Sequence, residues 1–340
     1  MRALGIGELV WDLLPSGPRL GGAPFNVVAH LAKLGCDAAL FSAVGRDELG
    51  ARTLDEVRRL SVSTAFIQVV DVPTGVVRVQ LDRFGVPEYE IVSPAAYEYL
   101  SPVDQVGASG QLDIVVFGTL AQRSPGTLAT TQKIAQTERP AVRLYDVNLR
   151  PGRWSPSLVE ELLGLATVVK MNDAEAVILA EELSLAREST AAFSMAMATR
   201  YGLRGVCVTR GADGAALLYN GTYREAQAVP IVVADTVGTG DAFAAGLAFG
   251  ITTGLDVETV LELGSRLASL VASRPGALPD WDLSELGMEF PMPPVRSREP
   301  AGASPAGGSI ADNSRTPSEV NTRRGEPSPP TPGETPRLQQ

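Results

Sequence analysis

Short apolar runs alternate with amphipathic stretches along most of the chain, and this alternation limits the possible fold more than any other feature. The runs are bounded by turn residues and are too short to be helices, which is typical of buried strands. We predict strands over 4–7, 38–44, 114–117, 142–145, 167–169 and 205–209. We predict helices over 24–34, 48–60, 127–137, 174–181 and 191–201. Strands alternating with helices form βαβ units, so we expect an α/β fold with a doubly wound, mainly parallel sheet. Ligands of such sheets bind at the carboxyl ends of the strands.

One region departs from this alternation. Residues 74–82 and 86–92 alternate apolar and polar side chains around Arg83-Phe84-Gly85, which is typical of a hairpin with one exposed face. We interpret the region of about 72–95 as a small β lid that projects from the main sheet. Residues 10–22 can add to this lid.

The acidic composition excludes some classes of partner. The net charge of −10 and the pI of about 4.8 argue against a nucleic-acid or anionic-membrane surface, which would need basic residues. The N-terminus reaches Glu8 and Asp12 before any long apolar run, so we expect no signal peptide. Cys36 and Cys207 lack metal-ligand spacing, and we expect both to be reduced thiols in a cytoplasmic protein.

The composition changes near residue 291. The last fifty residues are rich in Pro, Ser, Gly, Thr and Arg and show no hydrophobic periodicity. Such a segment cannot bury enough apolar surface to offset its ordering entropy. We therefore predict a domain over 1–290 and a disordered tail over 291–340.

The stretch over 230–246 carries the strongest chemical signal. It is read as an apolar strand that runs into a glycine-rich turn and then into a helix of small residues. Gly238 and Gly240 let the backbone present its N–H groups to an anion, which the helix dipole also attracts. Asp241 stands at this point, either as a helix N-cap or as a base that takes a proton from an attacking hydroxyl. The chain has no Walker A motif, so a phosphotransferase would not be of the P-loop type.

A second constellation lies near the N-terminus. Gly21 and Gly22 precede Pro24, which suits the first turn of a helix, and Asn26 follows one turn in. With Asp12 upstream, these groups offer the paired donors and acceptors that bind sugar hydroxyls. Taken alone the pattern is weak, and a solvent-facing Asn26 is the alternative.

Together the two stretches resemble the paired motifs of the PfkB/ribokinase family of carbohydrate kinases. The first is GGAPFNVVAHLAKLG at 21–35, and the second is DTVGTGDAFAAG at 235–246. The likeness covers about 3–285. It implies a ribokinase-like three-layer α/β/α sandwich with a β lid, and ATP-dependent phosphorylation of a hydroxymethyl group on a small sugar.

The resemblance also implies roles for matching positions. The catalytic base and its anion hole would be Asp241 with Gly238, Thr239 and Gly240. The sugar would be held by Asp12, Gly22 and Asn26. Hydrated Mg²⁺ near the ATP phosphates would be organised by Asn172 and Glu175. Nucleotide-binding positions would be Thr209 and Gly211. A loop for a monovalent cation such as K⁺ would comprise Asp235 and backbone near Thr236, Val271, Arg274 and Gly276.

Several segments indicate which members of the family the chain resembles most. Residues 7–12, 24–26, 73–75 and 146–151 are more similar to bacterial fructokinases than to ribokinases. Arg150 would contact the substrate or a phosphate, or else pair with Asp146. Gly264 departs from the family, many members of which have Asn near the adenine. His30 is interpreted as a packing or surface residue.

Three functions remain open at this level. Fructose phosphorylation is favoured, and kinases for ribose, 2-keto-3-deoxygluconate or a nucleoside come second. A catalytically silent sugar-binding regulator is the alternative from another class, although Asp241 and its glycines are intact. A dinucleotide-dependent oxidoreductase is weaker, because no Gly-x-Gly-x-x-Gly follows the first strand. Relatives often pair through their lids, so the resemblance allows a homodimer.

Overall fold

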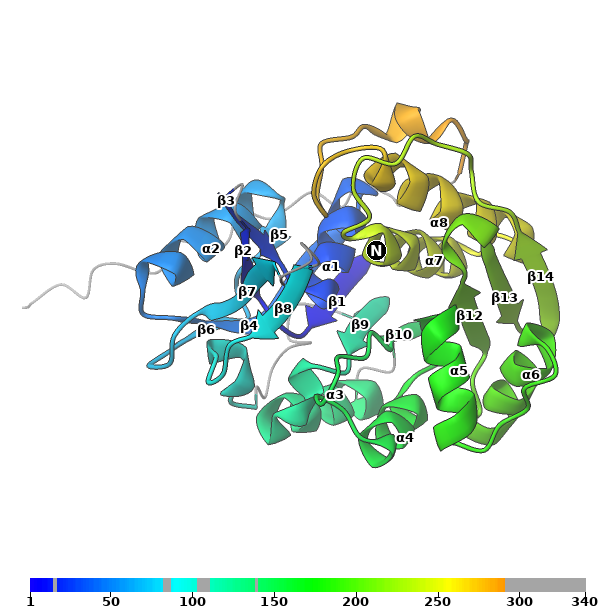
Figure 1. The fold of residues 1–340 in the computed structure, drawn as a ribbon, viewed down its shortest axis with the longest axis horizontal. Coiled ribbons are helices and arrows are strands. Elements are labelled where there is room, and N and C mark those ends of the chain that lie inside the picture. Colours follow the sequence, from blue (N-terminus) through cyan, green and yellow to red (C-terminus); the bar gives the residue numbers. More distant parts are fainter. Residues whose placement is uncertain (15–16, 82–86, 103–110, 138–139, 291–340) are drawn as a thin grey trace, which may run out of the picture. The chain divides into compact units, whose positions relative to one another are not determined.

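The computed structural model describes residues 1–290 except 15–16, 82–86, 103–110 and 138–139. Ten strands of these residues form the main sheet, in the order β14-β13-β12-β11-β10-β9-β1-β4-β5 with β6 also paired to β4 (Figure 1). All pairs are parallel except those that β13 makes with β12 and β14. The strands are β1 (Arg2–Ile6), β4 (Asp37–Gly45), β5 (Val62–Ser63), β6 (Ile67–Val70), β9 (Ile114–Gly118), β10 (Val142–Asp146), β11 (Val168–Asn172), β12 (Gly205–Thr209), β13 (Ala215–Tyr219) and β14 (Thr222–Ala226).

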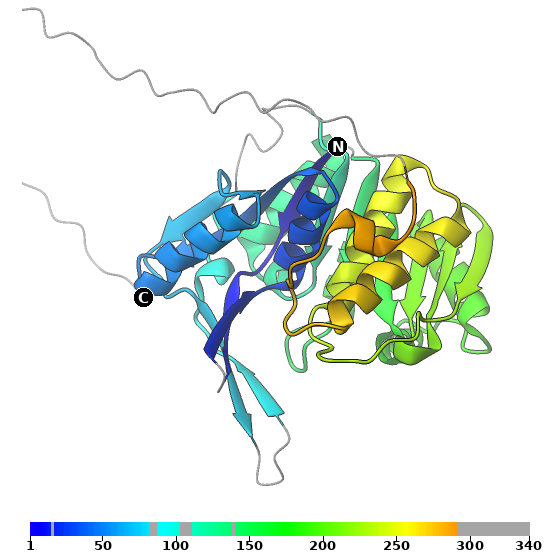
Figure 2. The same cartoon turned by 90° about the horizontal axis from the view of Figure 1, so that it is seen from above.

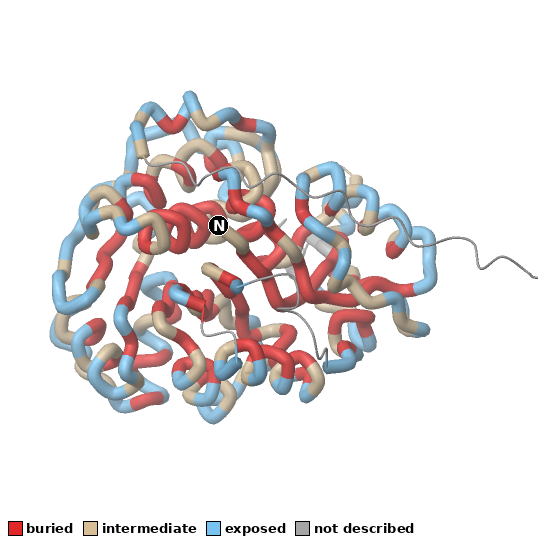
Figure 3. Tube along the Cα trace, turned by 180° about the vertical axis from the view of Figure 1, so that it is seen from behind, coloured by how far each residue is buried: buried red, intermediate tan, exposed pale blue. Residues whose placement is uncertain are grey.

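Helices cover both faces of this sheet and make a three-layer sandwich. One face packs on α1 (Ala23–Lys33), α2 (Glu48–Arg59), α7 (Thr239–Thr253) and α8 (Val257–Ala272). The other packs on α3 (Pro125–Thr137), α4 (Pro156–Leu165), α5 (Asp173–Glu182) and α6 (Thr190–Tyr201). Separate apolar cores fill the two layers, and Figure 3 shows buried backbone along the central strands and α7. None of the helices within the described ranges has the length and apolar content to cross a bilayer.

Helix α7 is buried along most of its length, from Ala242 to Ile251. A helix that is apolar on all sides belongs in a core. It packs closely on α8, since a Cβ on Gly246 would lie 2.8 Å from the Cα of Gly264. The N-terminus of α7 is thereby fixed against the carboxyl ends of the central strands.

A separate four-stranded sheet forms the lid, in the order β3-β2-β7-β8. Its strands are β2 (Val10–Leu14), β3 (Gly17–Gly21), β7 (Gly75–Leu81) and β8 (Pro87–Ile91). Figure 2 shows the β7–β8 hairpin projecting away from the main sheet. The lid prediction is confirmed, including the added N-terminal strands, although the turn at Arg83-Phe84-Gly85 lies outside the described residues.

Two predictions of detail have clear outcomes in the structure. The strand predicted at the start of 230–246 is wrong, because residues 230–233 form no ladder and Val232 is 90% exposed. Its chain is instead tied to α8, where the N–H of Ala234 donates to the Ala272 carbonyl at 2.9 Å. Both cysteines are buried free thiols, as expected. The tail predicted over 291–340 lies outside the described residues.

His30 is a packing residue of α1. Its Nε2 lies 3.1 Å from the Ala277 carbonyl oxygen, and Trp281 donates from Nε1 to its Nδ1 at 3.3 Å. Burial lowers the pKa of His30 to about 4, so the ring is neutral at physiological pH. The neutral ring holds the chain after α8 against α1.

Candidate active site

The N-terminus of α7 leaves backbone N–H groups uncapped. Its N-cap, Gly238, has φ +77°, and a Cβ there would lie 2.6 Å from the Cα of Ala277, so only glycine fits. No side chain caps the helix, and the N–H groups of Gly240 and Asp241 find no acceptor among the described residues. Free N–H groups and the positive end of a helix dipole together attract an anion.

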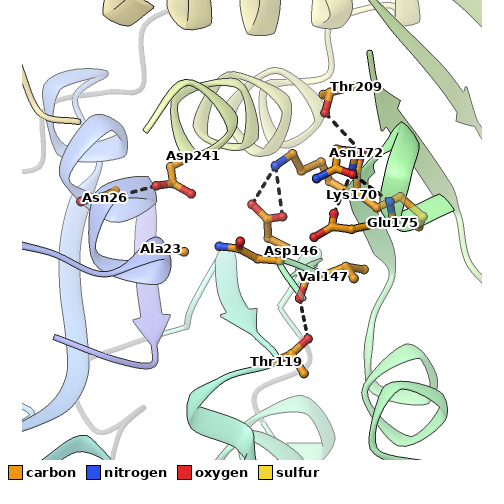
Figure 4. A network of polar contacts seen from close by, with 12 residues as sticks. Ala23, Asn26, Thr119, Asp146, Val147, Lys170, Asn172, Glu175, Thr209 and Asp241 are labelled. Carbon is orange, nitrogen blue, oxygen red and sulfur yellow. Dashed lines mark hydrogen bonds and ion pairs between the residues drawn. The ribbon is translucent and has the colours of Figure 1, made fainter. Parts of the chain in front are cut away.

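Asp241 is the third residue of α7, so its interpretation as the N-cap is wrong. The carboxylate instead accepts a hydrogen bond of 2.8 Å from Nδ2 of Asn26 (Figure 4). Burial raises the pKa of Asp241 to about 7, helped by the nearby charge of Asp146 and opposed by Asn26, Lys170 and Arg150. A carboxyl with a pKa near neutrality can accept a proton at physiological pH.

Asn26 lies on α1 and is only 5% exposed, so the solvent-facing alternative is wrong. Its Oδ1 is buried without a partner in the described structure. Gly22 allows the chain to enter α1 here, because at φ +132° a Cβ would lie 2.1 Å from the Glu8 carbonyl oxygen. Of these two predicted sugar-binding positions, Asn26 contacts Asp241 and Gly22 lies against the backbone of Glu8.

Glu8 is a buried carboxyl that our sequence interpretation gave no role. Its Oε1 accepts from the N–H of Ala23 at 3.3 Å, while Oε2 has no partner among the described residues. Burial raises its pKa, against the charge of Arg150. The available signal was its place just after β1, at the edge of the sheet where ligands bind.

Asp12 and Arg150 approach the site from the lid and from the loop after β10. Burial raises the pKa of Asp12, and Arg150 opposes this shift. Arg150 donates from Nη1 to Oδ1 of Asn148 at 2.6 Å. The alternative, an ion pair between Arg150 and Asp146, is not found among the described residues, where Asp146 has another partner.

That partner is Lys170, which the sequence did not mark as functional. Asp146 and Lys170 are register neighbours on β10 and β11, and Nζ lies 3.1 Å from both carboxylate oxygens (Figure 4). They are 2% and 6% exposed. Burial alone would lower the pKa of Lys170, but the carboxylates of Asp146, Asp241 and Glu175 outweigh burial and raise it.

Asn172 and Glu175 form a capping box at the start of α5. The Glu175 N–H donates to Oδ1 of Asn172 at 2.8 Å, and Oε2 of Glu175 accepts from the Asn172 N–H at 2.9 Å. Oε1 of Glu175 accepts from the Leu149 N–H at 2.8 Å. Since these oxygens already accept N–H groups, the pair suits a magnesium ion held through water better than one bound directly.

A cavity of about 440 Å³ joins the predicted nucleotide positions to the anion site. Thr209 and Gly211 line it together with Thr239 and Gly240. The wall is largely apolar and includes Val229, Ile231, Val233, Phe243 and Ala268. Gly264 packs tightly against Phe243, because a Cβ would lie 3.0 Å from its ring.

The predicted cation loop comes together around Asp235. Its Oδ2 accepts from the Gly276 N–H at 2.9 Å, and its Oδ1 accepts from the Val237 N–H at 3.0 Å. The carbonyls of Thr236 and Val271 accept hydrogen bonds from within their own turns, and Arg274 donates to Glu285 and to the Asp280 carbonyl.

A cation at this loop would have a competitor. Nη1 of Arg19, on lid strand β3, lies 3.5 Å from Oδ2 of Asp235. Within the described ranges, no three His, Cys, Asp or Glu side chains gather as a metal cluster. A monovalent ion would therefore depend on Asp235 and backbone carbonyls, and would share the carboxylate with a guanidinium.

Comparison with known proteins agrees with this geometry. The model of the pfkB family of carbohydrate kinases matches residues 18–282. The chain is 30% identical to a fructokinase of Salmonella typhimurium over 80% of this chain and 94% of the relative. It is 28% identical to a 2-dehydro-3-deoxygalactonokinase of Haloferax volcanii over 74% of this chain and 81% of the relative.

A solved structure extends the likeness to three dimensions. An uncharacterized sugar kinase of Pyrococcus horikoshii in complex with ATP superimposes with a TM-score of 0.68 at 26% identity. The match covers 81% of this chain and 94% of that one. The ribokinase-like sandwich with its lid is thus confirmed.

Proposed function

The chain belongs to the pfkB family of carbohydrate kinases, and from this premise we propose that it transfers the γ-phosphoryl group of ATP to the terminal hydroxymethyl group of a small sugar. Fructose is the first candidate acceptor. The observation that carries the proposal is the position of Asp241, a carboxyl with a pKa near 7 beside the free N–H groups of α7. A base and an anion site at one helix terminus are what hydroxyl-to-phosphate transfer needs.

In this proposal Asp241 is the base, and the turn over 238–240 receives the transferring phosphate. As the hydroxyl oxygen attacks, its proton passes to the carboxylate, which Asn26 orients through its 2.8 Å hydrogen bond. The unpartnered Oδ1 of Asn26 is free to accept from a sugar hydroxyl. Gly22 and Asp12 complete the sugar side, and Arg150 contacts sugar or phosphate.

The nucleotide would occupy the cavity lined by Thr209 and Gly211. Its apolar wall suits the face of a purine base. Asn172 and Glu175 would hold hydrated Mg²⁺, which neutralises phosphate charge when it is bound. K⁺ at Asp235 is the second proposed ion.

A second acceptor class is supported by one specific observation. The relative from Haloferax volcanii is named for a keto-deoxy sugar acid, and Arg150 could pair with the carboxylate of such a substrate. A coupled ADP-release assay with fructose, ribose, 2-keto-3-deoxygluconate, adenosine and mannose separates these acceptors. Release of ADP with none of them would support the silent sugar-binding alternative.

The mechanism is tested by Asp241→Asn, which keeps the shape of the side chain and removes its basicity. We expect kcat to fall by about two to four orders of magnitude, the usual contribution of a general base. The affinity for the sugar should change little. The melting temperature should not fall, because the variant removes a carboxyl whose charged form is disfavoured by burial.

Asp256→Asn is the matched control, because Asp256 is a true N-cap that accepts from the N–H groups of Glu258 and Thr259. It should leave kcat unchanged, with at most a small loss of stability. A stable Asp241→Asn variant with near-normal turnover would contradict the assignment of the base.

A further inference from the structure

Lys170 holds a buried positive charge directly beside the anion site of α7. A Cβ built on Gly240 would lie 3.0 Å from Nζ of Lys170. Gly240 is the second residue of α7, and its N–H is one of the groups without an acceptor among the described residues. The ammonium and these N–H groups therefore border the same space, from β11 and from α7.

The ammonium also has donor capacity left over. Its described hydrogen bonds both go to Asp146, whereas an ammonium has three N–H donors. A buried donor normally finds an acceptor. For the third N–H of Lys170, this acceptor would lie at the start of α7.

We propose that Lys170 is a further catalytic residue, whose ammonium contacts the phosphoryl group in transfer, and that Asp146 positions it. The inference rests on the proposed kinase function. Asp146 is held at the end of β10, so the pair of 3.1 Å contacts fixes Nζ at the edge of the sheet. An ammonium fixed before the reaction stabilises developing charge without reorganising.

The chemical step has a defined balance. The sugar hydroxyl oxygen forms a bond to the γ-phosphorus, and the bond from that phosphorus to the β–γ bridging oxygen breaks. The electron pair of the broken bond leaves with ADP, and the hydroxyl proton passes to Asp241. Lys170 exchanges no proton in this step, since its role is to oppose the negative charge on the phosphoryl oxygens.

A purely structural salt bridge makes a different prediction, and a double variant separates the two roles. Lys170→Met leaves Asp146 buried and unpaired, so it should lower both stability and turnover in either case. Asp146→Leu/Lys170→Met removes both charges, and a buried pair replaced by apolar residues often keeps its stability. The double variant is therefore the decisive protein, and it is expected to fold even where the single variant does not.

The experiment measures kcat, KM for ATP and the melting temperature of the wild type and the double variant. We expect the double variant to melt near the wild type while its kcat remains about 100-fold to 1000-fold lower, the range for loss of one preorganised charge or donor. KM for ATP should change by only a few-fold. Recovery of kcat together with the melting temperature would overturn the proposal.

A second measurement keeps this test separate from the choice of sugar. ADP with magnesium and fluoroaluminate mimics the phosphoryl group in transfer, while ADP alone does not. The double variant should bind ADP normally and lose at least tenfold in affinity for the fluoroaluminate complex. Equal affinities for that complex would refute the role of Lys170. Absence of kinase activity in the wild type would refute the proposed function instead.

Discussion

The main sheet and the lid both contribute residues to the candidate site, but the strands of the main sheet are more completely buried than those of the lid. Strands β10 and β11 of the main sheet are almost wholly buried, and Asp146 and Lys170 lie in their carboxyl-terminal halves between two apolar cores. In the lid, β3 is largely exposed and Leu13 of β2 is 38% exposed. Elements with few buried contacts open and move more easily than core elements.

This difference in burial suggests that the main body and the lid have different roles in the reaction. The groups proposed for the chemistry are Asp241, Lys170 and the turn over 238–240, and all of them belong to the main body. Asp12 comes from the lid and Asn26 from the helix that follows it. We infer that the body sets the rate of phosphoryl transfer and that the lid discriminates between acceptors.

The largest effect that tests this division concerns pH. Because Asp241 has a pKa of about 7 and must be deprotonated to act, kcat/KM should rise with pH up to about 7. It should be about 100-fold lower at pH 5 than at its plateau, tenfold for each pH unit. A profile that is flat between pH 5 and 8 would contradict Asp241 as the base.

Two variants sharpen the pH comparison between body and lid. Asp146→Asn removes a negative charge that raises the pKa of Asp241, so the acid limb should move to lower pH. Asn26, Lys170 and Arg150 lower the pKa of Asp241, whereas Asp12 lies on strand β2 of the separate lid sheet. Asp12→Asn should therefore leave the acid limb of the pH profile unchanged. An equal shift of this limb in both variants would contradict the separate roles of body and lid.

The next effect is on acceptor binding. Asp12→Ala should raise KM for the sugar by roughly 10-fold to 100-fold, since hydrogen bonds to a charged group contribute about 1.5–3 kcal/mol. KM for ATP should stay within about twofold, because the cavity proposed for the nucleotide is lined from the body. Steady-state kinetics with each substrate varied in turn checks this, and a loss confined to kcat would contradict a binding role.

A smaller effect concerns the cation loop, where lid and body meet. Replacing K⁺ by tetramethylammonium should lower kcat, and the loss should be about twofold to fivefold greater in Arg19→Gln. The carboxylate of Asp235 would be shared by K⁺ and by the exposed guanidinium of Arg19, a partner of modest strength. Without K⁺, the carboxylate keeps the Arg19 charge in the wild type and loses it in Arg19→Gln. Arg46→Gln is the control, because it breaks an exposed ion pair with Asp71 elsewhere. Identical rates in both salts for the wild type, Arg19→Gln and Arg46→Gln would contradict the proposal that this loop binds K⁺.

The sequence predicted the fold well because its signals are local. Buried parallel strands are continuous apolar runs, and predicted strands such as 205–209 agree with the structure. The strand predicted at the start of 230–246 fails for the same reason, because Pro230, Ile231 and Val233 line the cavity proposed for the nucleotide and do not enter the sheet. Local hydrophobicity does not distinguish a ligand wall from a core.

The site was predicted where glycines and one carboxylate mark a helix terminus. The Lys170–Asp146 pair was not predicted, because the pairing depends on the register of two parallel strands, which sequence spacing does not give. Asn172 and Glu175 show the converse. Their spacing was interpreted through magnesium, and the structure reveals that the same spacing also makes a capping box.

The smallest expected effect lies at the end of the domain. A chain that ends after Phe290 should keep the kcat and the melting temperature of the full chain, because the residues beyond it include few large apolar side chains. Phe290 itself packs edge-on against Phe249 of α7, with ring centroids 5.4 Å apart. A chain that ends after Gly287 loses this contact, so it should melt roughly 2–4 °C lower, which corresponds to about 1 kcal/mol in a domain of this size. Calorimetry on the three chains measures the difference. A lower melting temperature for the chain that ends after Phe290 would mean that residues beyond 290 stabilise the body, and the compositional prediction of a disordered tail would be wrong.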